Sequence, residues 1–251
     1  MKLFGKVKKV KIEKILKKIE DFAPPETAEE WDNSGWQINL HNCEANKILA
    51  CLTVTDDVLE HAVVMGCDLI ISLHPLIFSP LKKLENPLHQ RAIKNNIQIY
   101  SAHTNFDRAF GGTTDILVEK LGLSGIKKIN DYVKAGELPF ELPLEKFIAA
   151  VKTTYSLDKI KLINKLAKPA VKTVAICAGA GAEFIGDVCG ADVYITSDVK
   201  YHAALEVKDM ALLDIGHFES EKFFSEKIVE ILKDEPVEVI TADEKPAWTI
   251  V

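Results

Sequence analysis

The fold is indicated first by the stretch GCDLIIS at residues 66–72, in which a glycine precedes a short and almost wholly apolar run. A helix-closing glycine followed by a buried strand is typical of α/β proteins. A second stretch of the same pattern, GADVYIT, lies far along the chain at residues 190–196. Two matched segments at this separation predict an internal repeat, and a repeat sets the architecture of a fold.

The sequence around both stretches also matches. Upstream, the strand-like residues 47–50 correspond to residues 173–176, and downstream the segment 101–107 corresponds to 215–221. Strand and helix patterns alternate between these segments, and apolar runs without period-2 alternation indicate strands covered on both faces. The sequence therefore predicts an α/β fold of two similar three-layer α/β lobes that arose by internal duplication.

A change of composition predicts the boundary between the lobes. After Gly125 the chain becomes polar and then irregular, with prolines at positions 139 and 143, and such clusters are typical of connecting segments. We therefore expect an N-terminal α/β lobe at residues 1–126 and a C-terminal α/β lobe at residues 127–251.

Composition and charge exclude several classes of protein. The chain has 251 residues with 31 Lys and Arg against 37 Asp and Glu, a net charge of -6. This leaves no broad basic surface, so nucleic acid is not an expected partner. No apolar run reaches the roughly 20 residues that a membrane span needs. Five cysteines without a C-x-x-C spacing indicate reduced thiols of a cytoplasmic protein.

Histidines and carboxylates follow the matched strands. They are His74, then His103 with Asp107, and His217 with Glu221. Ligands of open α/β sheets collect beyond the carboxyl ends of strands, so two facing lobes would pool these side chains. Imidazole with carboxylate is a donor set for zinc, iron or manganese. A histidine followed four residues later by a carboxylate is weak evidence by itself. The placement of two such pairs after equivalent strands favours a metal site in the cleft between the lobes.

Five motifs in order resemble the signatures of one family. They are EEWDNSGWQI (29–38), SLHPLIF (72–78), AHTNFD (102–107), SDVKYH (197–202) and GHFESE (216–221). The chain resembles the Ngg-one-interacting-factor-three family, whose members are commonly labelled GTP cyclohydrolase 1 type 2 homologues or dinuclear metal center proteins. The resemblance covers nearly the whole chain.

The resemblance implies a dinuclear metal centre in the cleft and a homo-oligomer, usually a hexameric ring. The ligands it implies are His74, His103, Asp107, His217 and Glu221, with Asp107 as the bridging carboxylate. The family usually has two adjacent histidines where this chain has Leu73 before His74. One expected ligand is therefore missing, and both one and two divalent ions remain open.

The family label implies a metal-dependent hydrolase acting on a nucleotide or a related small molecule. Opening the guanine ring of GTP with release of formate would need an acid–base group, for which His202 and Asp198 are candidates. The sequence has no P-loop and no G-x-G-x-x-G motif, so the expectation of a nucleotide substrate depends on the family label. Trp31 and Trp36 could meet a substrate, although core packing is the favoured interpretation of both.

The alternative is a non-enzymatic metal-binding or protein-interaction protein with a regulatory role. Loss of a ligand at Leu73 favours this alternative. Whether the protein is an enzyme therefore stays open: steady turnover of nucleotides with added Mn, Fe or Zn would indicate the hydrolase, and tight metal binding without turnover would indicate the binding protein.

Overall fold

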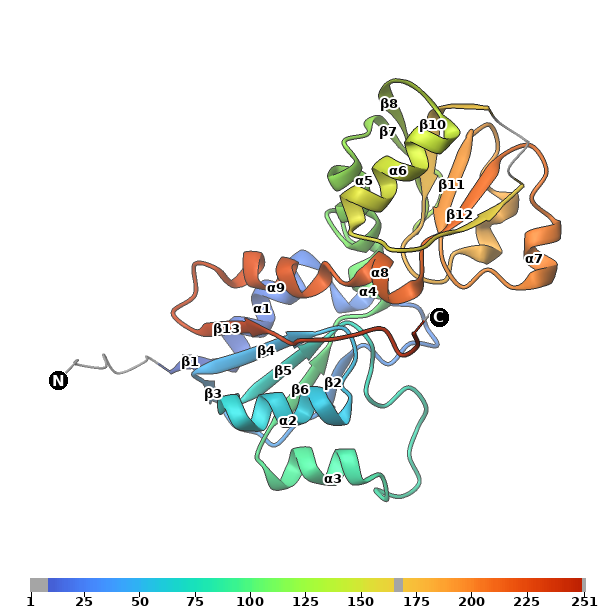
Figure 1. Ribbon diagram of the computed structural model, residues 1–251. Helices are drawn as coiled ribbons and strands as arrows, with labels where there is room; N and C mark the ends of the chain where they lie inside the picture. Colours follow the sequence, from blue (N-terminus) through green and yellow to red (C-terminus); the bar gives the residue numbers. More distant parts are fainter. Residues whose placement is uncertain (1–8, 165–168, 250–251) are drawn as a thin grey trace. The chain divides into compact units, whose positions relative to one another are not determined.

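The computed structural model describes residues 9–164 and 169–249, and it divides into two compact units (Figure 1). Among the described residues, the first unit contains residues 9–110 together with Phe224–Lys245, and the second contains residues 111–223 together with residues 246–249. Helices and strands alternate in both units, which confirms the predicted α/β class.

The first unit is built on a sheet of five strands. In spatial order they are β13 (Glu238–Thr241), β4 (Lys47–Cys51), β5 (Leu69–Ser72), β6 (Gln98–Ser101) and β2 (Gly35–Ile38). Only β2 runs antiparallel to its neighbour; the other pairs are parallel. Parallel neighbours need a crossover, and the helices α2 (Asp56–Met65) and α3 (Pro87–Lys94) provide two of them.

Helices cover both faces of this sheet. Figure 1 shows α2 and α3 on one face, and α1 (Ile12–Phe22) with α9 (Phe224–Leu232) on the other. Buried apolar residues of β4, α2 and α3 share one core cluster. The remaining elements are short, namely β1 (Val10–Lys11) paired with β3 (Glu44–Ala45), the 3-10 helix η1 (Pro25–Thr27) and the helix α4 (Thr104–Arg108).

The second unit is built on a sheet of six strands. In spatial order they are β7 (Ser124–Lys128), β8 (Lys134–Pro143), β10 (Ala170–Ile176), β11 (Val193–Thr196), β12 (Ala211–Asp214) and β9 (Lys161–Ile163). The central strands β10, β11 and β12 are parallel, in chain order. The first unit has the same arrangement in β4, β5 and β6, whereas the internal duplication itself stays a prediction.

Alternating side chains of the central strands form two cores. Val174 and Ile176 pack in a cluster with residues of α5 (Thr113–Leu121) and α6 (Leu144–Tyr155). Ala175 packs in a second cluster, next to the 3-10 helix η2 (Ala182–Gly186). The helix α7 (Tyr201–Leu205) contacts η2, and α8 (His217–Glu221) follows β12. The second unit is therefore also a sheet between two covering layers.

The two glycines of the matched stretches differ in their setting. Gly66 closes α2 with a positive φ of 67°, as the sequence predicts. Gly190 also has a positive φ, 85°, but it follows the 3-10 helix η2 and a loop instead of an α-helix. The prediction of a helix-closing glycine is therefore wrong at the second stretch, although a buried strand follows both glycines.

The observed units differ from the predicted lobes at both ends. The chain enters the second unit at Gly111, because α5 and β7 pack with β8. Residues 224–245 return to the first unit, where Val239 of β13 pairs with Ile48 of β4. The segment predicted to be irregular forms β8, and its Pro139 lies where the pairing of β8 with β10 shifts register. Proline is tolerated in strands at such irregularities.

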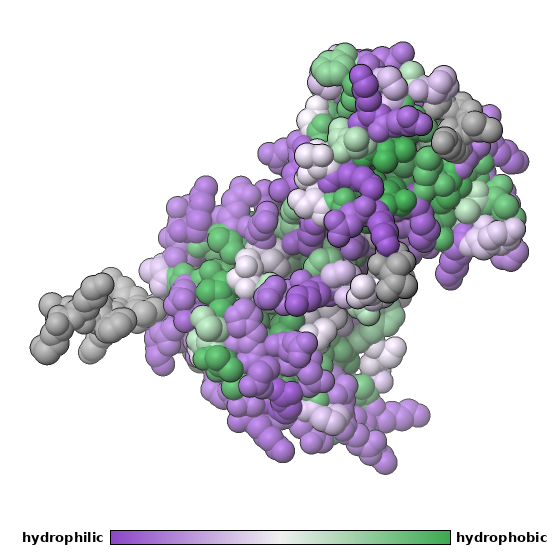
Figure 2. Space-filling model, viewed as in Figure 1, coloured by the Kyte–Doolittle hydropathy of each residue, from purple (hydrophilic) through white to green (hydrophobic). Residues whose placement is uncertain are grey.

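Surface character agrees with the charge content of the sequence. On the face drawn in Figure 2, hydrophilic side chains predominate over α3 and its neighbourhood. Within the described ranges, no helix has both the length and the apolar character that crossing a membrane requires.

Candidate metal site

Two of the predicted ligands lie at the carboxyl edge of the first unit's sheet. His74 comes two residues after β5 and His103 two residues after β6, and these strands are parallel neighbours. Their ring centroids lie 5.8 Å apart with the planes at 82°. Asp107 is partly buried on α4, where its backbone N–H donates to the carbonyl of His103 over 3.1 Å. The structure thus brings the imidazoles of His74 and His103 together.

Asp32 holds the imidazole of His103. The distance from Nδ1 to Oδ1 of Asp32 is 2.8 Å, and this carboxylate is fully buried. It also accepts hydrogen bonds from Oγ1 of Thr104 (2.6 Å) and Oγ of Ser34 (2.7 Å). Burial raises the pKa of Asp32, but the hydrogen bonds from these three residues outweigh it and hold the pKa well below its usual range. Because Nδ1 donates to a carboxylate, Nε2 is the nitrogen that would bind a metal.

His74 is oriented in the same way by a hydroxyl group. Oγ1 of Thr53 lies 2.7 Å from Nδ1 of His74, and the backbone N–H of His74 donates to the carbonyl of Leu52 over 2.8 Å. The preceding residue, Leu73, is completely buried. The position at which the resemblance implies a second histidine is therefore part of the hydrophobic core.

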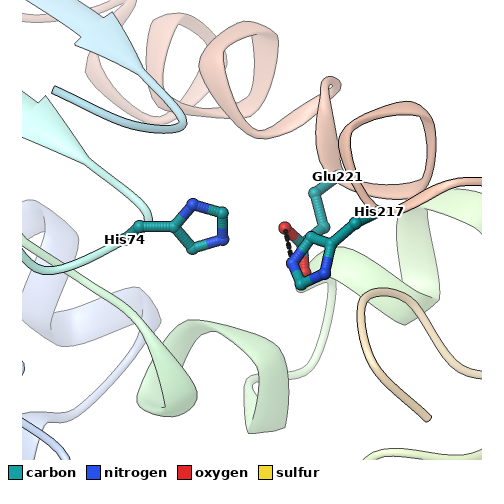
Figure 3. A group of neighbouring side chains, drawn as sticks. All are labelled: His74, His217 and Glu221. Atoms are coloured by element: carbon teal, nitrogen blue, oxygen red, sulfur yellow. Dashed lines mark ion pairs between the residues drawn. The ribbon is translucent and has the colours of Figure 1, made fainter. Parts of the chain in front are cut away.

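The second unit carries an imidazole–carboxylate pair on α8. Figure 3 shows the ion pair between Nε2 of His217 and Oε2 of Glu221, which lie 3.0 Å apart. Nδ1 of His217 lies 2.7 Å from Oδ2 of Asp198, on the loop after β11. Glu221 is 5% exposed. His217 is thus held between two carboxylates, one of which is buried.

The surroundings of His217 suit a cation. Burial lowers the pKa of His217, but the hydrogen bonds and negative charges of Glu221 and Asp198 outweigh it and raise the pKa to about 10. Gly179 approaches the same carboxylate, because a Cβ built there would collide with Oε1 of Glu221. One carboxylate, one imidazole and the backbone of Gly179, which has no side chain to fill the space, fit the requirements of a divalent metal site.

The two residues predicted to act in acid–base chemistry have different surroundings. Asp198 hydrogen bonds to His217, so its contact favours an orienting role for this carboxylate. His202 is exposed on α7, with its ring 5.5 Å from that of Tyr201. Among the contacts described for His202, none links it to His217, and its role stays a prediction.

Three contributors were not predicted from the sequence. Asp32 orients His103, and Thr53 orients His74. Gly179 leaves room for the carboxylate of Glu221. Asp32 could have been found, because it is a carboxylate without an assigned role within the motif at residues 29–38. Thr53 follows an ordinary apolar strand, and Gly179 lies in a glycine-rich turn, so neither had a distinguishing pattern.

These features define an α/β protein in which histidines and carboxylates follow the ends of parallel strands in both units. The sequence profile of the Duf34/NIF3 (NGG1p interacting factor 3) family matches residues 10–247. The chain belongs to this family, which confirms the resemblance that the motifs indicated.

Known proteins similar to the chain include two bacterial relatives. A protein named GTP cyclohydrolase 1 type 2 homolog from Clostridium perfringens is 38% identical over 94% of this chain and 97% of its own length. One of the same name from a Nostoc species is 37% identical over 89% of this chain and 92% of its own. The crystal structure of a Bacillus cereus protein related to NIF3 superposes with a TM-score of 0.90, at 23% identity, over 97% of this chain and 100% of the other. That last likeness shows the fold alone.

Proposed function

We propose that the protein is a metal-dependent hydrolase that acts on a nucleotide or a related small molecule. Its ligands for one or two divalent ions, Zn, Fe or Mn, would be His74, His103 and Asp107 with His217 and Glu221. The observation that carries the proposal is the His217–Glu221 pair, with Asp198 on the second ring nitrogen. A metal-binding histidine is typically oriented by such a partner on its other nitrogen.

The same arrangement recurs on the first unit and supports the proposal. His103 and His74 each have Nδ1 engaged, by Asp32 and by Thr53 respectively. An imidazole fixed in this way needs no reorientation to bind a metal through Nε2, so the entropy cost of forming the site is reduced.

A metal held at such a site would supply hydrolytic chemistry. A bound divalent ion lowers the pKa of a coordinated water from 15.7 to about 7. Glu221 and Asp107 would hold negative charge near such an ion, and Asp32 and Asp198 orient the imidazoles of His103 and His217. We propose His202 as the acid–base group for the substrate, because its imidazole is exposed and can donate or accept a proton.

The substrate class and the assembly rest on relatives. Proteins similar to this chain are named GTP cyclohydrolase 1 type 2 homolog, and we propose a guanine nucleotide as the first substrate to test. We also propose a homo-oligomer, a hexameric ring, in the cytoplasm; light scattering would test it, and a mass near 27.9 kDa would contradict it.

Metal content and turnover together test the function. Protein purified without chelators should contain at least one Zn, Fe or Mn per chain by elemental analysis, and Glu221→Gln should lose most of it. Glu230→Gln is the matched control, because Glu230 is an exposed carboxylate paired with Lys227. Formate release from GTP should require metal and fail in Glu221→Gln. Metal binding without turnover of any nucleotide would instead establish the non-enzymatic alternative.

A further inference from the structure

Two large aromatic side chains of the first unit lie in solvent and touch one another. Trp31 is 61% exposed and Phe78 is 57% exposed. Their ring centroids are 5.9 Å apart, with the planes inclined at 47°. Core packing, the interpretation favoured from the sequence, is therefore wrong for Trp31. Trp36 is 37% exposed and is therefore not a buried core residue either, although its ring packs edge-on against that of Tyr100 at 5.6 Å.

The loops that carry the two rings are fixed to one another. The side-chain amide of Asn33 donates to the carbonyl of Ile77 over 2.5 Å, and the N–H of Ile77 donates to Oε1 of Gln37 over 2.9 Å. These bonds join the residues next to Phe78 with the motif that contains Trp31. The aromatic pair is thus held in place without a ligand, which lowers the entropy cost of binding one.

The pair lies beside the histidines of the first unit. The indole of Trp31 is 6.3 Å from the ring of His103, at 77°, and His103 is 5.8 Å from His74. Asp32, the residue after Trp31, is the one that orients His103. The same short loop therefore positions a candidate metal ligand and presents an exposed aromatic surface next to it.

We propose that Trp31 and Phe78 form a stacking platform for a planar heteroaromatic ring of the size of a nucleobase. The proposal rests on the hydrolase function proposed above and names the part of the substrate that the protein recognises. Aromatic side chains bind bases by stacking because every base has a π-face. A ring stacked on Trp31 lies beside His103, so the platform holds the substrate's ring next to the metal ligands. Both aromatic residues are positioning residues.

The test measures binding of GTP, with inorganic tripolyphosphate as the probe that lacks a ring. In zinc-loaded protein, Trp31→Ala and Phe78→Ala should keep the parental zinc content and the parental affinity for tripolyphosphate. Their dissociation constants for GTP, measured by calorimetry, should rise roughly 5- to 100-fold. Trp248→Ala is the matched control, since Trp248 is 55% exposed and belongs to the other unit, and its affinity for GTP should not change.

Two results would overturn the platform. One is a parent protein that binds GTP no more tightly than tripolyphosphate, and the other is a Trp31→Ala variant with the parental affinity for GTP. If that variant also showed a reduced mass in light scattering, the aromatic pair would be assigned to contact between copies of the chain. Failure of the hydrolase proposal would appear separately, as an unsubstituted protein that binds no zinc. In that case the GTP titration of metal-free protein would test the platform.

Discussion

Replacing Gly179 by alanine is expected to weaken both the fold and the candidate metal site. Gly179 has a φ of +65°, and a Cβ there would collide with Oε1 of Glu221. The left-handed backbone conformation costs an alanine about 1–2 kcal/mol. Glu221 is 5% exposed and paired with His217, so moving its carboxylate weakens a buried charge-assisted hydrogen bond that contributes about 1.5–3 kcal/mol. Together the substitution should lower the free energy of unfolding by about 2.5–5 kcal/mol.

A second glycine separates the two contributions. Gly122 has a φ of +68° in the same unit, and a Cβ there would meet nothing within 4 Å. Gly122→Ala should therefore show only the backbone cost of about 1–2 kcal/mol and keep the parental affinity for zinc. Gly179→Ala should be the less stable of the two in urea unfolding of metal-free protein, and should bind zinc at least tenfold more weakly by calorimetry.

Equal behaviour of the two variants would refute this reasoning. If Gly179→Ala lost no more stability than Gly122→Ala and bound zinc with the parental affinity, the carboxylate of Glu221 would not depend on the space beside Gly179. A variant that lost stability but kept its zinc affinity would show that Glu221 moves without leaving the site.

Three further predictions concern other residues. Asp32→Asn removes the charge that orients His103, so zinc affinity should fall about 10- to 100-fold, and an unchanged affinity in calorimetry would contradict the orienting role. Leu73→His places an imidazole in a completely buried position, so urea unfolding should show a loss of about 2–5 kcal/mol, whereas parental stability would mean that the side chain reaches solvent. Exposed thiols should react with an aromatic disulfide within minutes and buried thiols only after unfolding, because burial raises the pKa of the Cys67 thiol to about 11. The exposed thiols are Cys43 and Cys189, and the buried ones are Cys51, Cys67 and Cys177.

The parallel strands of the fold could be predicted because their signals are local. The run at residues 69–72 is apolar throughout and follows a glycine with a positive φ, which marks the end of a helix. The strand β13 has no comparable signal of its place: its pairing with β4 joins residues nearly two hundred positions apart. Nothing local distinguishes a strand that returns to the first sheet from one that continues the second, so the predicted boundary missed the return.

The residues of the candidate site could likewise be predicted where the signal is local, and not where it depends on distant parts of the chain. The i,i+4 spacing of His217 and Glu221 is visible in the sequence, and the structure pairs these residues on one helix. The partners that orient the imidazoles come from far away: Asp32 is 71 positions from His103, and Thr53 is 21 positions from His74. Such contacts depend on which strands are neighbours, and the motif spacing does not contain this information.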